Sequence, residues 1–90
     1  MFGRDPIQHA LLEFSTNHQA VEFCKATLFG VKVYDGRSWF RTTAVCVSQT
    51  QVLFRVQKSA YQRLAEHIQI TGQIEIETRS LAVLDIRQGR

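Results

Sequence analysis

Residues 5–14 read Asp-Pro-Ile-Gln-His-Ala-Leu-Leu-Glu-Phe, and the fold of the chain depends on the structure of this stretch. Asp5 and Pro6 are typical of a helix start, because aspartate caps free backbone N–H groups and proline needs no donor in the first turn. The apolar residues that follow have the spacing of one helical face: Ile7, Ala10, Leu11 and Phe14. The pattern therefore predicts a first helix over residues 6–14.

The same stretch also allows a strand, and this alternative changes the fold. If residues 9–14 form a strand, the chain reads strand, helix, two strands, helix, strand, which is the order of a split βαβ sandwich. The helix is preferred because its predicted start and its four apolar positions agree with each other.

A second helix is predicted from Thr16 to about Leu28. Thr16 and Gln19 have the spacing of a capping box, in which two side chains satisfy free N–H groups at the helix start. A helical stripe continues through Ala20, Val21, Cys24 and Leu28. A strand is the competing interpretation, because Val21 and Phe23 are also good strand formers.

From residue 30 the sequence becomes rich in β-branched and aromatic residues. Asp35 and Gly36 lie between two such runs and predict a hairpin, because both residue types tolerate the positive φ of a tight turn. A further turn is expected at residues 48–50. The runs at 31–34, 38–47 and 51–56 therefore predict a three-stranded meander.

The C-terminal third is predicted to contain one short helix and two strands. Ser59 and Gln62 form a second capping-box candidate. Helical spacing follows at Tyr61, Leu64, Ala65 and Ile68. We expect a strand with one wet face over residues 68–76, with Gly72 at a bulge or bend, and a last strand over 81–86.

Together these elements predict one α+β domain over residues 1–90, since a chain of this length rarely divides into two cores. Its centre is a small antiparallel five-stranded sheet or a partly closed barrel, with N-terminal helices and one short inserted helix. The longest apolar run, 44–47, is too short to cross a bilayer, and the first residues lack the layout of a secretory signal. We therefore expect a cytoplasmic domain with no membrane partner.

The two cysteines, Cys24 and Cys46, form no CxxC pair. A structural zinc site usually takes four ligands in two close pairs, so no metal site and no cofactor is predicted. Apolar neighbours predict that both thiols are buried and inert, and a single disulfide is the alternative in an oxidising compartment.

Positive charge is concentrated in residues 30–58, where five basic residues against one acid give a local net of +4 within a chain of net +3. Arg37, Trp39 and Arg41 alternate there, so a strand places them on one face. An indole between two guanidinium groups can stack on a base while the arginines bind phosphates. The supporting cations are Lys32, Arg55 and Lys58. The alternative is that arginine stems cover Trp39 and serve only stability.

No catalytic site is predicted. His18 and Glu22 stand one helical turn apart and predict a surface pair. Ser48, His67 and Asp85 supply the residue types of a hydrolytic triad, but Ser48 lies in no nucleophile elbow.

We therefore expect a non-enzymatic binding module for single-stranded nucleic acid or another anionic partner, such as an acidic protein. The alternative function is a protein-interaction module that forms a homodimer, because a small sheet has edges that must be covered or paired.

Two short segments resemble known families. Residues 31–37 resemble the opening of Sm-like RNA-binding barrels, but residues 41–51 lack the glycine, the acidic residue and the asparagine of that family. Residues 37–41 resemble the RxxxR element of PilZ domains, which bind a cyclic dinucleotide. Of the accompanying [D/N]xSxxG element only Ser48 is present, so the sequence assigns the chain to neither family.

Overall fold

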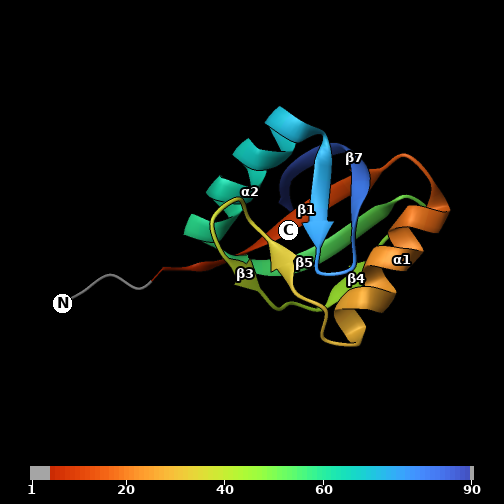
Figure 1. Ribbon diagram of the computed structural model, residues 1–90, viewed down its shortest axis with the longest axis horizontal. Coiled ribbons are helices and arrows are strands. Elements are labelled where there is room, and N and C mark those ends of the chain that lie inside the picture. The colour runs from red at the N-terminus through yellow and green to blue at the C-terminus, as the bar shows by residue number, and fades with distance from the viewer. Residues whose placement is uncertain (1–4, 90) are drawn as a thin grey trace.

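The stretch at residues 7–14 forms a strand, β1 (Ile7–Phe14), in the computed structural model, which describes residues 5–89 (Figure 1). Ala10, Leu12 and Phe14 have no exposed surface, whereas the residues between them are partly exposed. This period of two is that of a strand with one face on the core. The predicted helix over 6–14 is therefore wrong, and the strand alternative for this stretch is confirmed.

The helices and strands follow in the order β1, α1 (Asn17–Leu28), β2 (Val33–Tyr34), β3 (Trp39–Phe40), β4 (Ala44–Cys46), β5 (Gln51–Gln57), α2 (Lys58–Thr71), β6 (Gln73–Ile76) and β7 (Arg79–Gly89). The strands make one antiparallel sheet in the order β3-β2-β6-β7-β1-β5-β4. The α+β class and the antiparallel sheet are confirmed. The sheet is open and has seven strands, so the predicted five strands and the partly closed barrel are wrong.

The expected strand at 38–47 is divided between the two edges of the sheet. β3 pairs with β2 at one edge, and β4 pairs with β5 at the other. The segment 41–43 joins them. It spans a gap between β3 and the part of β5 that is not paired with β4, and we call this gap the seam. Phe40 and Phe54 stack across the seam with ring centroids 6.5 Å apart. The two edges therefore approach each other, but β3 does not pair with β5.

Helix α1 forms where it was predicted, but Val21 and Leu28 of the expected apolar stripe are exposed. Thr16 is its N-cap, and the Thr16 side chain accepts the Gln19 N–H at 3.2 Å. The buried face includes Phe23, whose ring lies 5.5 Å from that of Phe14 and 5.7 Å from that of Phe54. These aromatic contacts fix α1 on the core face of the sheet.

Helix α2 is capped from the other end of the chain. The Asp5 carboxylate accepts the Ser59 N–H at 3.1 Å, and the Pro6 carbonyl accepts the Lys58 N–H at 2.8 Å. Asp5 and Pro6, which predicted a helix start, thus cap a helix that begins more than fifty residues later in the chain. They reach it because β1 and β5 are antiparallel neighbours.

The length of α2 corrects the prediction for the C-terminal third. The helix has 14 residues rather than being short, and it includes Ile68 and Ile70, which were expected in a strand. It ends at Gly72, whose φ of +68° is that of a left-handed C-cap. Gly72 therefore lies at a bend between α2 and β6 and not at a bulge within a strand.

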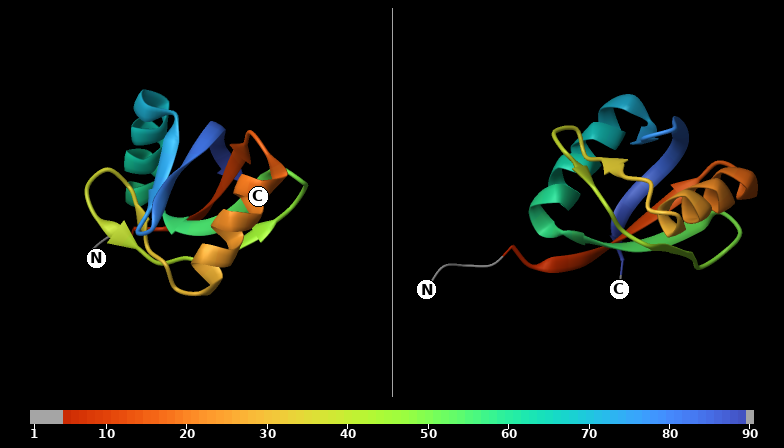
Figure 2. Two further views of the ribbon diagram at one scale, coloured as in Figure 1. Left: turned by 45° about the vertical axis from the view of Figure 1, so that its right-hand side comes forward. Right: turned by 60° about the horizontal axis from the view of Figure 1, so that its bottom comes forward.

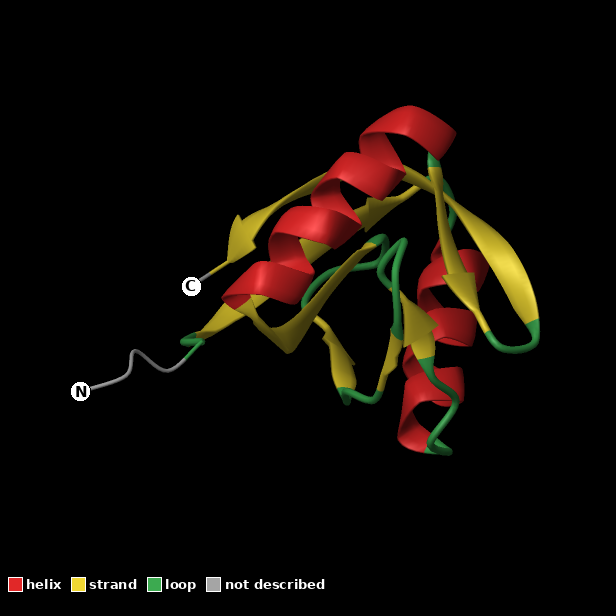
Figure 3. Cartoon of the chain, turned by 60° about the vertical axis from the view of Figure 1, so that its left-hand side comes forward, coloured by secondary structure: helices red, strands yellow, loops and turns green. Residues whose placement is uncertain are grey.

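Both helices lie on the same side of the sheet formed by β4, β5, β1 and β7 (Figure 2). They lie apart from each other, α1 mainly on β4 and α2 mainly on β6 and β7 (Figure 3). Within residues 5–89 neither helix combines the length and the apolar content that crossing a membrane requires. Within residues 5–89 no helix lies over the opposite side of the sheet.

Candidate anion-binding surface

The turn before β3 is organised by Asp35, whose side chain is only 1% exposed. One carboxylate oxygen accepts the N–H groups of Arg37 and Ser38, each at 2.8 Å. The other oxygen accepts two bonds from Arg63 of α2, from Nε at 3.1 Å and from Nη2 at 2.9 Å. The hairpin is thus tied to α2 before any ligand arrives.

The hairpin predicted from Asp35 and Gly36 is confirmed, but its connection differs from a two-residue turn. Four residues, 35–38, join β2 to β3. Only Gly36 has a positive φ, +97°, whereas Asp35 acts through its side chain.

The charge state of Asp35 follows from opposing effects. Burial alone raises the pKa of Asp35, but the hydrogen bonds from Arg63, Ser38 and Arg37 outweigh burial and hold the pKa below the usual 3.8. Asp35 is therefore ionised at neutral pH, and Arg63 is occupied by it rather than free for a ligand.

Trp39 lies on the surface at β3, with 48% of the residue exposed. Its ring centroid lies 4.9 Å from that of Tyr34, and the Tyr34 and His67 rings are perpendicular with centroids 5.7 Å apart. The three rings form a row that runs from the hairpin to α2. Tyr34 and His67 were not among the predicted site residues, although Tyr34 could have been found as the partner of Trp39 across the hairpin.

Four of the predicted cations are exposed and form no salt bridge within residues 5–89: Arg37, Arg41, Arg55 and Lys58. Other arginines of the described chain are paired, for example Arg79 with Glu22 and Arg87 with Asp85. These four cations lie in the segment that the sequence identified as basic, although Lys25 of α1 is also exposed and forms no salt bridge within residues 5–89.

Lys32 stands apart from these four cations. It is partly buried, and its backbone N–H donates to the carboxylate of Glu77 at 2.7 Å. A neighbouring acid weakens the attraction of Lys32 for an anion.

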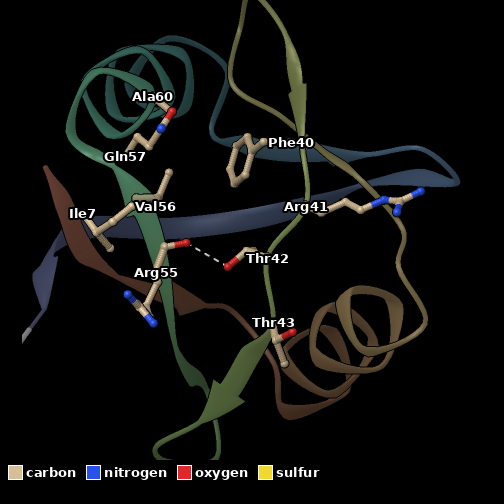
Figure 4. Close-up of a pocket in the computed structure, with 9 residues that line it drawn as sticks. All are labelled: Ile7, Phe40, Arg41, Thr42, Thr43, Arg55, Val56, Gln57 and Ala60. Carbon is tan, nitrogen blue, oxygen red and sulfur yellow. Dashed lines mark hydrogen bonds between the residues drawn. The ribbon is translucent and has the colours of Figure 1, made fainter. Parts of the chain in front are cut away.

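A pocket of about 440 Å³ occupies the seam (Figure 4). Its lining residues are Ile7, Phe40, Arg41, Thr42, Thr43, Arg55, Val56, Gln57 and Ala60. The Thr42 hydroxyl donates to the Arg55 carbonyl at 2.8 Å, where a paired strand would have supplied a backbone donor. Figure 4 shows Phe40 and Val56 facing each other while the guanidinium groups of Arg41 and Arg55 extend outward. The pocket thus has apolar side chains inside, and the guanidinium groups of its two arginines point away from it in different directions.

Arg37 lines a second, smaller hollow of about 220 Å³, together with Gly36 and His67. The structure thus brings Arg41 and Arg55 to one pocket and places Arg37 and Trp39 on the hairpin beside it. Lys58 begins α2. The six predicted residues do not converge on one cavity.

The histidine that could belong to a hydrolytic triad pairs with a different acid. His67 Nε2 lies 3.1 Å from a carboxylate oxygen of Glu75, rather than against Ser48 or Asp85. His18 and Glu22 form the predicted surface pair at 2.8 Å. In the part of the chain that the structure describes, no three histidine, cysteine or acidic side chains are grouped as metal ligands would be.

The cysteines differ from the prediction. Cys46 is exposed, Cys24 is partly buried, and their Sγ atoms lie 3.0 Å apart. The expectation that both thiols are buried is therefore wrong, because β4 is an edge strand that leaves Cys46 open to solvent.

Comparisons with family models, with curated proteins and with solved structures find no match to this chain.

Proposed function

We propose that this chain is a non-enzymatic module that binds single-stranded nucleic acid through the β2–β3 hairpin and the rim of the seam. The observation that carries the proposal is the half-exposed Trp39, the only tryptophan, with Arg37 and Arg41 two residues to either side and no acid paired to them within residues 5–89.

The chemistry of binding follows from these groups. A base stacks on the open face of Trp39, which contributes about 1–3 kcal/mol per base in such sites. The guanidinium groups of Arg37 and Arg41 bind flanking phosphates through two parallel hydrogen bonds and release counterions. Because Asp35 and Arg63 already hold the hairpin, little ordering is needed on binding.

Changing Arg37 and Arg41 together to glutamine is expected to weaken binding of a labelled oligothymidylate by about 100-fold, since each arginine–phosphate contact is taken as worth about 1.5 kcal/mol in all. The slope of log affinity against log salt should fall by about 1.4, for two lost phosphate contacts. Quenching of Trp39 fluorescence in a salt series measures both quantities.

The matched control changes Arg79 and Arg87 to glutamine, which removes the same charge from residues that are paired with acids. Both double variants should melt within about 3 °C of the wild type, because all four positions are exposed. Equal loss of affinity in the two variants would show attraction to net charge and would contradict a site at the hairpin.

A second candidate function, self-association, is supported by the bare side of the sheet. Val45, Leu53 and Leu11 lie in register across β4, β5 and β1, and Val45 is 55% exposed. His9 and Arg55 lie in register on one side of this row, and Glu13 and Asp85 lie in register on the other. A second copy related by a two-fold axis would place the basic side on the acidic side around an apolar centre.

Sedimentation equilibrium tests this second candidate. Val45→Glu is expected to raise the dimer dissociation constant at least about tenfold, because it places a charge in the apolar centre. Ile70→Glu is the control, since Ile70 is 85% exposed on α2, away from this side of the sheet. A wild-type chain that stays monomeric at every concentration contradicts self-association.

A further inference from the structure

We infer that Cys24 and Cys46 are a redox modification site, at which an intramolecular disulfide joins helix α1 to edge strand β4. The inference does not depend on the proposed function, because it rests on the geometry of the two thiols alone.

The two sulfur atoms are 3.0 Å apart and belong to elements that pack on each other. A buried hydroxyl fixes this packing beside them. Thr27 Oγ1 donates to the Cys24 carbonyl at 3.0 Å and accepts the Ala44 N–H at 3.2 Å. Thr27 lies one helical turn after Cys24, and Ala44 lies two residues before Cys46, so the thiols face each other from elements that are already aligned.

The two thiols differ in their surroundings. Cys46 is exposed on an edge strand, so it is the sulfur that a soluble oxidant can reach. Cys24 is partly buried, and burial together with the hydrogen bond to Cys46 raises the pKa of its thiol to about 12. Cys24 is therefore the less reactive thiol, so the first oxidation is expected at Cys46, and Cys24 is assigned the resolving role because its sulfur lies 3.0 Å from that of Cys46.

Hydrogen peroxide is the oxidant class that we name for this step. The Cys46 sulfur takes one oxygen from the peroxide and becomes a sulfenic acid, and water leaves. The Cys24 sulfur then attacks the Cys46 sulfur. The sulfur–sulfur bond forms, the sulfur–oxygen bond breaks, and the hydroxyl leaves as water with the Cys24 proton. Two thiols are oxidised to one disulfide while one peroxide is reduced to two waters.

The disulfide closes the loop from residue 24 to residue 46, which contains the whole β2–β3 hairpin. Closing a loop of this length reduces the freedom of the unfolded chain, so the oxidised protein should melt about 10 °C higher than the reduced protein. Dithiothreitol should return the melting temperature to that of the reduced protein.

The experiment treats the reduced full chain with hydrogen peroxide and follows the intact mass, the free-thiol count and the molecular size. We expect a loss of two hydrogen atoms, a thiol count that falls from two to none, and a monomer on a non-reducing gel. A rise in mass or a disulfide-linked dimer overturns the inference.

Two single variants separate the roles of the thiols. In Cys24→Ser, the Cys46 sulfenic acid should persist and react with dimedone, because no resolving thiol remains. In Cys46→Ser, the partly buried Cys24 should be oxidised at least about tenfold more slowly than the wild-type pair. If the wild-type chain keeps both thiols under conditions that label Cys46 in Cys24→Ser, the inference is wrong.

Discussion

Replacing Leu12 with alanine is expected to lower the free energy of unfolding by about 3 kcal/mol, whereas the same change at Leu11 should lower it by about 1 kcal/mol. Leu12 has no exposed surface and faces the core between the sheet and the helices. Leu11 is the next residue of the same strand, is partly exposed and faces the opposite side, beside Leu53. The two substitutions remove the same atoms, so the difference measures burial alone.

Urea denaturation of the two variants at neutral pH measures this difference. The ranking tests the secondary structure of residues 7–14 directly. A helix over this stretch places Leu11 in the apolar stripe with Ile7 and Phe14, so it predicts the larger loss at Leu11. A larger loss at Leu11 than at Leu12 would therefore refute the strand.

Replacing Asp35 with alanine is expected to lower the free energy of unfolding by about 3 kcal/mol at pH 7. The change leaves two backbone N–H groups, of Arg37 and Ser38, without their acceptor and removes the partner of Arg63. This expected loss is at the low end of the range for a buried ion pair, because Arg63 is 34% exposed and can still reach water. Oligonucleotide affinity should fall as well, since the turn no longer holds the hairpin.

The pH dependence of this loss follows from the lowered pKa of Asp35. A group whose pKa is lower in the folded state contributes its full stability above its unfolded pKa and loses it as the pH falls through the folded value. The difference in the free energy of unfolding between wild type and Asp35→Ala should therefore be constant above about pH 5. It should shrink as the pH falls below 3.8, the usual pKa of aspartate.

Thermal unfolding of both proteins between pH 2 and pH 7 measures this dependence. Asp85→Ala is the control, because Asp85 is more than half exposed and its contact with Arg87 is long, at 3.4 Å. Asp85→Ala should lower the free energy of unfolding by no more than about 0.5 kcal/mol at every pH. A loss at Asp35 that is no larger than the loss at Asp85 would show that the turn does not depend on the carboxylate.

The error at residues 7–14 has a physical origin. Ala10 and Phe14 belong both to the helical series and to the alternating series, so the local pattern does not distinguish the two structures. The distinction comes from pairing, because β1 lies between β5 and β7, and both partners are distant in the sequence. The helix start predicted at Asp5 was wrong for the same reason, since the Asp5 carboxylate accepts the N–H group of the distant Ser59.

The site was predicted only in part. The basic segment and the position of Trp39 could be read from composition and alternation, and Trp39 is on the surface. Alternation also assumed one strand through 38–47, but residues 41–43 leave the sheet to join its two edges. The seam pocket exists because of this crossing, which no local pattern specifies.

What the sequence determined by itself is local: the helix that begins after Thr16, the hairpin at Asp35 and Gly36, and the excess of positive charge in residues 30–58. Each depends on groups a few residues apart, so neighbouring residues are enough to specify it. The tertiary structure alone decided that residues 7–14 are a central strand and that Cys24 meets Cys46. These outcomes depend on which distant segments bury apolar surface and satisfy backbone hydrogen bonds together, and that choice is made by the whole chain at once.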